Sequence, residues 1–378
     1  MAHSVEKLTQ LALFRRVSVE ALRSVQPLFR RVRVPAGKRL WSAGDPGNRL
    51  GILMSGTLRA RVEGQHLCTV RRGEVFGEGG AFFSEGRRTA DLVSDGDCKV
   101  VLFSRADLQQ MRAEHHVVYD ALLHECVRLL AARISATTLT LAKLAPGGVN
   151  RPTRQERGGL SRMWHKLVPG RPSGICPRLV PLLRRQPTMR GVPESILRQI
   201  AEQFKERAVE QGEVLCLEGE LVDAAWILAQ GGVNIIRNVG GGRAECLATL
   251  QVGALFGQNG LQSATSKRTA SCVASKASWL YQIDPAASRA LDGAAWRVWN
   301  ETLLHSFIEQ VRRSNQALGS LVVGTREQER ATAVTSDEIA SILNARGVLE
   351  GGSLEDELDQ MEFVVDDAAR REAHGRKR

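Results

Sequence analysis

The sequence predicts a mixed α+β fold of two tandem antiparallel β-barrel or jelly-roll domains, each with an N-terminal helical segment before it and a long C-terminal helix after it. Three observations predict this fold: an internal duplication, short strand-like segments between glycines, and helical periodicity on both sides of those segments. The chain has 378 residues, 43% of them hydrophobic, so each of two domains can bury a core. This composition excludes a disordered, collagen-like or disulfide-built chain.

The duplication shows in residues that recur at constant offsets. Three glycines recur 175 residues later: Gly37, Gly44 and Gly56 match Gly212, Gly219 and Gly231. A second group recurs 180 residues later: Gly73, Gly77, Arg88, Thr89 and Ala90 match Gly253, Gly257, Arg268, Thr269 and Ala270. The difference of five residues falls at residues 238–242, Asn-Val-Gly-Gly-Gly, where glycine suits a longer hairpin loop. One insertion in a turn, with both flanks in register, indicates a tandem duplication.

Within each copy, short strands and glycine turns come between helical segments. In the first copy we expect strands at residues 52–54, 58–62 and 99–103, a spacing typical of a closed or sandwiched antiparallel barrel. Helices are expected at residues 21–29 and 117–144, and in the second copy at 194–204 and 294–318. The helix expected at residues 117–144 carries a stripe of residues at helical spacing: Leu122, Leu123, Cys126, Leu129, Leu130, Arg133 and Ile134.

The expected domain boundaries follow the composition of the chain. Domain A spans residues 1–145, a basic linker 146–178, domain B 179–322, and an acidic, partly helical or disordered tail 323–378. Ten Lys and Arg face a single acid between residues 151 and 190, whereas residues 325–378 carry eight basic and thirteen acidic side chains. The net charge of +11 is therefore unevenly distributed.

The linker and the tail each contain an amphipathic pattern. In the linker, a short basic helix is predicted by Leu160, Met163, Trp164, Leu167 and Val168. Such a helix can dock onto its own neighbouring domain, a partner or a membrane surface, or attract nucleic acid. In the tail, residues 335–338 form a capping box before an apolar stripe that ends near residue 347, and an acidic amphipathic segment follows. The tail can dock a partner, fold onto the linker or stay loosely ordered.

Cysteine and histidine usage argues against disulfides and metals. The seven cysteines are scattered without a CxxC pair, and the eight histidines form no HxxxH or HxH spacing. We therefore expect reduced thiols and no metal site. No apolar run approaches the roughly 18 residues of a membrane-spanning helix, and the first ten residues show no signal-peptide pattern. These features predict a cytoplasmic protein.

The segment at residues 76–90, FGEGGAFFSEGRRTA, has the residue types of a phosphate and ribose site. Small residues after Gly77 leave backbone N–H groups unobstructed for an anion. Arg88 adds a permanently charged bidentate partner for phosphate, and Glu78 is an acceptor suited to a ribose hydroxyl. A structural alternative uses the same two residues as a buried ion pair without any ligand.

These motifs resemble the cyclic-nucleotide-binding domain family. FGE, then nine residues, then RTA is similar to its phosphate-binding cassette, and both copies are covered, from about residue 11 to 144 and 179 to 318. The resemblance extends to cyclic-nucleotide-gated channels, catabolite-activator-type regulators and protein kinase A regulatory subunits. It implies cAMP or cGMP as ligand, held by Gly77, Glu78, Gly79, Gly80, Arg88, Thr89 and Ala90, which we call site A. It also implies that the helix at 117–144 is a lid, with Ile134, Thr137 and Thr138 as base contacts. A structural alternative makes Ile134 an ordinary core residue and places both threonines on the surface.

The second copy departs from the family pattern at one position. Its equivalent residues, called site B, are Gly257, Gln258, Asn259, Gly260, Arg268, Thr269 and Ala270. Because Gln258 replaces the glutamate, the hydroxyl acceptor loses the charge that strengthens such a hydrogen bond. Site B is therefore expected either to bind weakly or to be a degenerate copy kept for packing.

These observations predict a non-enzymatic cyclic-nucleotide sensor, in which closure of the lid helix rearranges the linker, domain B and a surface for an unknown protein effector. The alternative is a structural or scaffolding protein whose cassettes bind no ligand. We find no catalytic constellation and no P-loop. No recognition helix follows residue 144, so no sequence-specific nucleic acid contact is expected. Peripheral membrane contact through the linker and a homodimer through residues 117–144 stay open.

Overall fold

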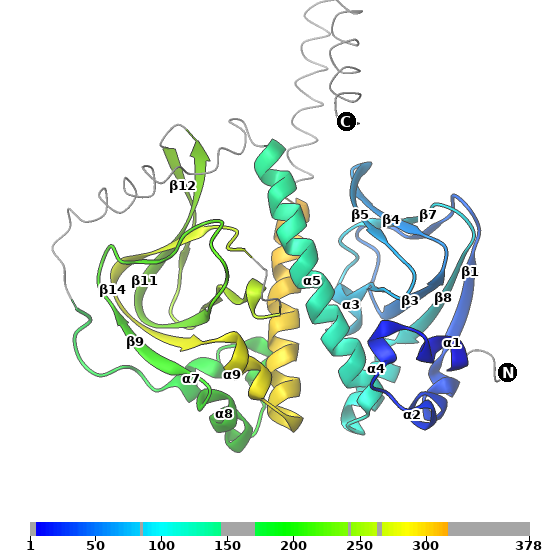
Figure 1. Ribbon diagram of the computed structural model, residues 1–378, viewed down its shortest axis with the longest axis horizontal. Coiled ribbons are helices and arrows are strands. Elements are labelled where there is room, and N and C mark those ends of the chain that lie inside the picture. Colours follow the sequence, from blue (N-terminus) through cyan, green and yellow to red (C-terminus); the bar gives the residue numbers. More distant parts are fainter. Residues whose placement is uncertain (1–4, 84–85, 145–170, 241–242, 263–266, 317–378) are drawn as a thin grey trace, which may run out of the picture. The chain divides into compact units, whose positions relative to one another are not determined.

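The structure is a computed structural model that describes residues 5–83, 86–144, 171–240, 243–262 and 267–316 (Figure 1). The helices predicted in the linker at residues 160–168 and in the tail at 335–347 lie outside the described residues. The described residues include 5–144 of domain A, 171–178 of the linker and 179–316 of domain B, with the gaps given above.

Domain A opens with short helices. They are α1 (Val5–Thr9), η2 (Ala12–Phe14), α2 (Val19–Ser24) and η3 (Gln26–Leu28). The Ser18 hydroxyl accepts a hydrogen bond from the backbone N–H of Ala21 at 3.1 Å and so caps α2. The prediction of one continuous helix over residues 21–29 was wrong. Pro27 has no backbone N–H to continue the α-helix, and the chain makes a 3-10 turn there before the first strand begins at Arg30.

The strands of domain A form two four-stranded antiparallel sheets. The first has the order β1 (Arg30–Val34), β8 (Cys98–Ser104), β3 (Arg49–Ser55) and β6 (Val75–Phe76). The second has the order β2 (Arg39–Trp41), β7 (Asp91–Ser94), β4 (Leu58–Val62) and β5 (Gln65–Val70). The predicted strands are confirmed, but the sheets are jelly-roll-like and do not close into a barrel.

Domain B contains one six-stranded sheet, because two of its strands are each continuous where domain A has two separate strands. Its helical elements are α7 (Leu179–Leu183), η4 (Pro187–Met189), α8 (Glu194–Ala201), η5 (Gln258–Gly260) and α9 (Pro285–Ala290). Its strands are β9 (Lys205–Val209), β10 (Val214–Cys216), β11 (Ala225–Gly240), β12 (Arg243–Leu250), β13 (Leu255–Phe256) and β14 (Ser271–Ile283). Strand β11 corresponds to β3 and β4 together, and β14 to β7 and β8.

The extra five residues of the second copy lengthen one hairpin, as the sequence predicts. In domain A the β4–β5 hairpin pairs Leu58 with Val70 and ends where Val62 pairs with Gln65. In domain B the equivalent β11–β12 hairpin pairs Val233 with Leu250 and continues to Gly240 and Arg243. The registers are the same at the base of both hairpins, which confirms the duplication at the level of strand pairing.

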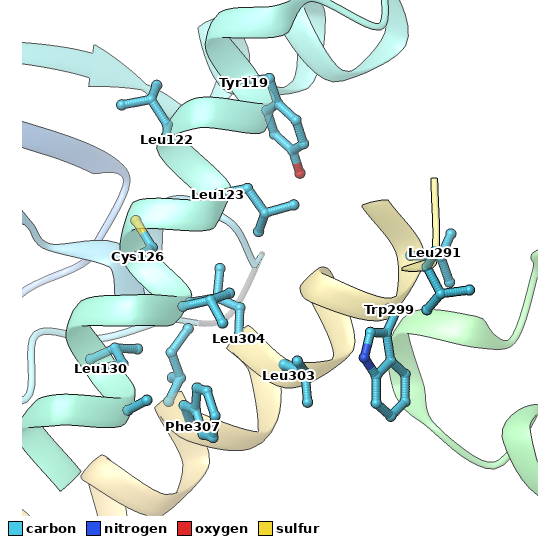
Figure 2. Close-up of a cluster of buried hydrophobic side chains, with 14 of the residues drawn as sticks. Tyr119, Leu122, Leu123, Cys126, Leu130, Leu291, Trp299, Leu303, Leu304 and Phe307 are labelled. Atoms are coloured by element: carbon cyan, nitrogen blue, oxygen red, sulfur yellow. The ribbon is translucent and has the colours of Figure 1, made fainter. Parts of the chain in front are cut away.

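Two long helices meet in the shared core. After α3 (Glu78–Ala81) and α4 (Arg105–Ala113), helix α5 spans Val117–Leu144 as predicted, and a second long helix covers residues 293–316. Apolar side chains of the two helices pack against each other (Figure 2). They are Tyr119, Leu122, Leu123, Cys126 and Leu130 on α5, with Trp299, Leu303, Leu304 and Phe307 on the 293–316 helix; Leu291, just before that helix, belongs to the same cluster. Domains A and B are thus joined through one apolar core.

Buried polar contacts add to this junction. The carboxylate of Glu301 accepts hydrogen bonds from Arg112 Nε at 2.6 Å and from the Tyr119 hydroxyl at 2.7 Å. Burial, followed by the negative charge of Glu301, raises the pKa of Tyr119, so its proton stays in place as a donor. Arg297 donates from Nε and Nη2 to the two oxygens of Asp120 at 2.6 and 3.0 Å. Because a buried charge without its partner is costly, these pairs favour one arrangement of the two long helices.

No described helix is long and apolar enough to cross a membrane. Among the described residues, no three His, Cys, Asp or Glu side chains gather as the ligands of a metal ion would.

The Leu304→Ala variant tests the junction between the long helices. Leu304 is fully buried in the shared core, so the cavity left by its truncation should lower the free energy of unfolding by about 2–5 kcal/mol. Urea denaturation followed by circular dichroism measures this loss. Val117→Ala is the control, because that side chain is 51% exposed and should change stability little. Equal midpoints for the two variants would contradict the packing shown in Figure 2.

Candidate functional site

Domain A contains a cavity with walls from both long helices and from the β-sheets. All seven residues predicted for site A line it: Gly77, Glu78, Gly79, Gly80, Arg88, Thr89 and Ala90. Further walls come from the strands through Trp41, Ala60, Leu67, Cys68, Val70, Phe76 and Leu92, and from the cassette through Arg87 and Asp91. Helix α5 contributes Leu130 and Arg133, and the 293–316 helix contributes Val311 and Asn315.

The glycines of the cassette allow backbone to approach side chains and other backbone closely. Gly77 has a φ of +81°, and a Cβ there would lie 2.4 Å from Arg88 Nη1 and 2.5 Å from the Trp41 ring. A Cβ at Gly80 would lie 2.2 Å from the carbonyl oxygen of Gly47. Arg105 holds these two segments together by donating to the Gly47 and Gly80 carbonyls at 2.9 and 2.6 Å. Arg105 was not predicted, because its role depends on a contact between distant loops.

Arg88 is a buried cation with part of its donor capacity unused. It is 8% exposed and donates from Nη1 to the Gly77 carbonyl and from Nη2 to the Arg49 carbonyl, both at 3.0 Å. Its guanidinium lies 3.4 Å from the centre of the Trp41 ring, while its buried Nε has no hydrogen-bond partner in the structure. Burial lowers its pKa to about 10, against the opposing effect of Glu78, so the group remains charged at neutral pH. No carboxylate among the described residues forms an ion pair with it.

Glu78 pairs with an arginine that the sequence did not assign to it. Its Oε1 accepts from Arg133 Nη1 at 3.3 Å, while its Oε2 is buried and has no partner. Arg133 also donates to the Val75 carbonyl at 3.2 Å. The alternative of a Glu78–Arg88 ion pair is therefore not the arrangement in this structure. The sequence did contain one signal for this pairing, because Arg133 is a charged residue within the apolar stripe of α5.

Of the three predicted base contacts, Ile134 does not line the cavity. Ile134 is 1% exposed, belongs to the main apolar core and is not among the cavity-lining residues. The side chains of Thr137 and Thr138 lie outside the part of the chain that the structure describes. Leu130 and Arg133 are the α5 side chains that reach the cavity.

Domain B contributes directly to the wall of site A. Asn315 is 7% exposed, and its Nδ2 donates to the Thr89 carbonyl at 3.1 Å. Val311, one turn earlier, lines the same cavity. Ile308 lies close to Gly79, since a Cβ at that glycine would be 3.7 Å from Ile308 Cγ2. The sequence could not predict these contacts, because nothing in it shows which face of the 293–316 helix meets domain A.

Site B repeats the arginine geometry of site A with one added partner. Arg268 donates from Nη1 to the Gly257 carbonyl at 3.1 Å and from Nη2 to the Ala224 carbonyl at 2.8 Å. These carbonyls are the counterparts of the two that hold Arg88. In addition, Nη2 donates to Asp223 Oδ1 at 2.8 Å, where the first copy has Asn48. Arg268 therefore already has an anionic partner from its own chain.

The rest of site B differs from site A at two positions: the residue that would accept the ribose hydroxyl, and the residue that packs against Gly260. Gln258 is buried and donates to the Ser306 hydroxyl at 2.6 Å, while the buried Oδ1 of Asn259 has no partner. Val222 stands where the first copy has Gly47, and a Cβ at Gly260 would lie 2.1 Å from Val222 Cβ. The half-buried Thr269 and Ala270 follow Arg268 as in the first copy.

Comparison with known families identifies both halves. The model of the cyclic nucleotide-binding domain family matches residues 31–115 and 206–291, and these two segments hold the cassettes of sites A and B. The chain carries two cyclic nucleotide-binding domains. The predicted family and the mixed α+β fold with two tandem domains are thus confirmed.

The chain is similar to the following known proteins and solved structures. A CRP-like cAMP-activated global transcriptional regulator of Mycobacterium tuberculosis is 28% identical over 179 residues, which are 43% of this chain and 78% of the relative. A structure of the regulatory domain of Toxoplasma gondii PKA with cAMP is 18% identical, with a TM-score of 0.28, and the match covers 78% of this chain and 92% of that one. A cyclic nucleotide-binding domain from Methylobacillus flagellatus is 22% identical, with a TM-score of 0.33, over 39% of this chain and 84% of that one.

The Gly77→Ala variant tests the close packing around Arg88. Gly77 and Gly44 both have a positive φ, +81° and +84°, so alanine strains the backbone at either position. Only at Gly77 would the new Cβ also meet Arg88 and Trp41, because nothing lies within 4 Å of a Cβ at Gly44. We expect Gly77→Ala to lower the thermal unfolding midpoint more than Gly44→Ala, by the equivalent of about 1–3 kcal/mol for the overpacking. Equal midpoints would show that Arg88 is not held against Gly77.

Proposed function

We propose that site A of domain A binds a cyclic nucleotide, cAMP or cGMP, and that the chain is a regulatory sensor rather than an enzyme. The observation that carries this proposal is the buried guanidinium of Arg88, which lines a cavity and forms no ion pair with a carboxylate of the described residues. An unpaired buried cation is costly. The phosphodiester of a cyclic nucleotide offers the missing negative charge and acceptor oxygens.

The other site A residues have complementary roles in this proposal. The unpartnered Oε2 of Glu78 accepts the ribose 2′-hydroxyl, while its Oε1 stays with Arg133. Thr89 contacts the phosphate or the base edge, and backbone N–H groups at Gly79 and Gly80 complete the phosphate cradle. Helix α3 has only four residues, so the positive charge of the site is assigned to Arg88 and not to a helix dipole. Ile134, Thr137 and Thr138 stay proposals for the base.

Ligand binding at site A is proposed to act on domain B through the two long helices. A ligand shifts a conformational equilibrium only by its differential affinity for the two states. Arg133 of α5 and Asn315 of the 293–316 helix lie in the same cavity wall, so closure over a ligand changes contacts of both helices at once. The packed core and the Glu301 contacts then carry the change into domain B. A protein effector that binds one of the two arrangements completes the sensor.

Site B is proposed to bind no cyclic nucleotide. Asp223, whose side chain is 80% exposed, already pairs with Arg268 at 2.8 Å, so a phosphate at Arg268 would meet a second negative charge. Gln258 removes the charged acceptor, and Val222 places a side chain against Gly260 where domain A has the close backbone contact of Gly47 with Gly80. One chain therefore binds one nucleotide.

The Arg88→Ala variant tests which arginine binds the ligand. Titration calorimetry of the wild-type chain with cAMP or cGMP should give one site per chain. Arg88→Ala should weaken binding by about 3–5 kcal/mol, more than a hundredfold in Kd, because a buried phosphate loses its cation. Arg268→Ala is the matched control and should leave affinity and stoichiometry unchanged. Two sites per chain in the wild type, or loss of binding in Arg268→Ala alone, would contradict this assignment.

A thermal unfolding assay separates the sensor from the scaffold alternative. A ligand at 100 times its Kd adds about 2.7 kcal/mol to the stability of the folded state. We expect cAMP, cGMP or both to raise the unfolding midpoint, while adenosine, which lacks the phosphate, should raise it less. If neither cyclic nucleotide shifts the midpoint at millimolar concentration, the scaffold interpretation is the better one.

A further inference from the structure

Two cysteines of domain B stand where domain A has a wall of its ligand cavity. In domain A, Trp41 and Leu92 are paired across β2 and β7, and both line the cavity. In domain B, the same register position pairs Cys216 with Cys272 across β10 and β14. The neighbouring pairs also match, Arg39 with Val93 in one domain and Val214 with Val273 in the other. The second cassette has therefore replaced an aromatic and an aliphatic side chain with two thiols.

The two cysteines are buried in one apolar core. Cys216 and Cys272 are each 5% exposed and belong to the same cluster of buried residues, so both side chains point to the same side of the sheet. They are also directly paired across the two strands. Directly paired residues of antiparallel strands have Cα atoms about 4.5–5.5 Å apart, and disulfides span Cα distances of about 4.4–6.8 Å. A bond between the two sulfurs therefore requires little movement of the backbone.

The surroundings of the two cysteines differ, and the difference indicates which thiol reacts first. The interaction with the neighbouring thiol of Cys272 lowers the pKa of Cys216, burial opposes this, and the positive charge of Arg268 lowers it further. The same interaction and burial raise the pKa of Cys272. Cys216 is thus the better nucleophile, since the thiolate is the reactive form. It is also the last residue of β10, a three-residue strand at the edge of the described sheet, where local opening admits a small oxidant.

We propose that Cys216 and Cys272 form a reversible redox site in which a peroxide converts the two thiols into a disulfide. The Cys216 thiolate attacks one peroxide oxygen, the O–O bond breaks, and the leaving hydroxide takes a proton to become water. The resulting sulfenic acid at Cys216 is attacked by the sulfur of Cys272, which forms the S–S bond, breaks the S–O bond and releases a second water. Two thiols lose two electrons, and hydrogen peroxide is reduced to two waters. A dithiol reductant reverses the reaction. This site does not depend on nucleotide binding at site A.

Peptide mapping of the full chain tests the proposal without any variant. Hydrogen peroxide is added in increasing amounts, remaining thiols are blocked with N-ethylmaleimide under denaturing conditions, and tryptic peptides are analysed without reduction. Cleavage after arginine and lysine gives peptides 208–237 and 269–276, each with a single cysteine. We expect these two peptides to appear joined, with the mass loss of two hydrogens, and to separate with both thiols restored after treatment with dithiothreitol.

Cysteine variants make the assignment specific. Cys246→Ser is the control, because Cys246 is exposed and lies on β12, which β11 separates from β14. It should leave the joined peptide unchanged, whereas Cys272→Ser should abolish it and leave Cys216 as a sulfenic acid that dimedone labels. The proposal is overturned if peroxide fully oxidises Cys246 in the wild type while Cys216 and Cys272 stay free thiols. It is equally overturned if either cysteine is joined to a different partner, or if reduction does not restore both thiols.

Discussion

The buried guanidinium of Arg88 is the interaction on which the structure of site A depends. Two backbone carbonyls, from Gly77 and Arg49, fix its orientation, and the ring of Trp41 covers one of its faces. This arrangement is possible only because Gly77 has no side chain. The protein thus holds a positive charge in a cavity wall without a direct ion pair among the described residues, and the stability cost of that charge is the physical reason to expect an anionic ligand.

The duplication provides an internal comparison for this argument. Arg268 has the same two carbonyl contacts as Arg88, so the backbone frame of the cassette is retained in domain B. One change, Asp223 in place of Asn48, gives the second arginine a carboxylate from its own chain. The wall that domain A builds from Trp41 and Leu92 has become a thiol pair. After the duplication, the two domains therefore kept the same backbone contacts around the arginine but differ in the side chains that surround it.

The sequence predicted what depends on local pattern and on repetition. The bounds of α5, the hairpin insertion and the seven cassette residues of site A follow from periodicity, glycine spacing and the repeat, and the structure places all seven around one cavity. What it missed depends on contacts between distant segments. The partner of Glu78 is Arg133 on α5, and Asn315 reaches site A from the other domain. The break at Pro27 had a local signal, the missing N–H donor of proline, that a purely periodic analysis overlooked.

The central claim is that Arg88 binds the phosphate of a cyclic nucleotide, whereas the equivalent Arg268 is already paired with Asp223. A crystal structure of the chain grown with cAMP or cGMP tests both parts at once. The account predicts nucleotide in domain A alone, with phosphate oxygens about 2.7–3.2 Å from the Arg88 guanidinium, and Arg268 still bonded to Asp223. Nucleotide bound in domain B, or bound in domain A without contact to Arg88, would contradict it.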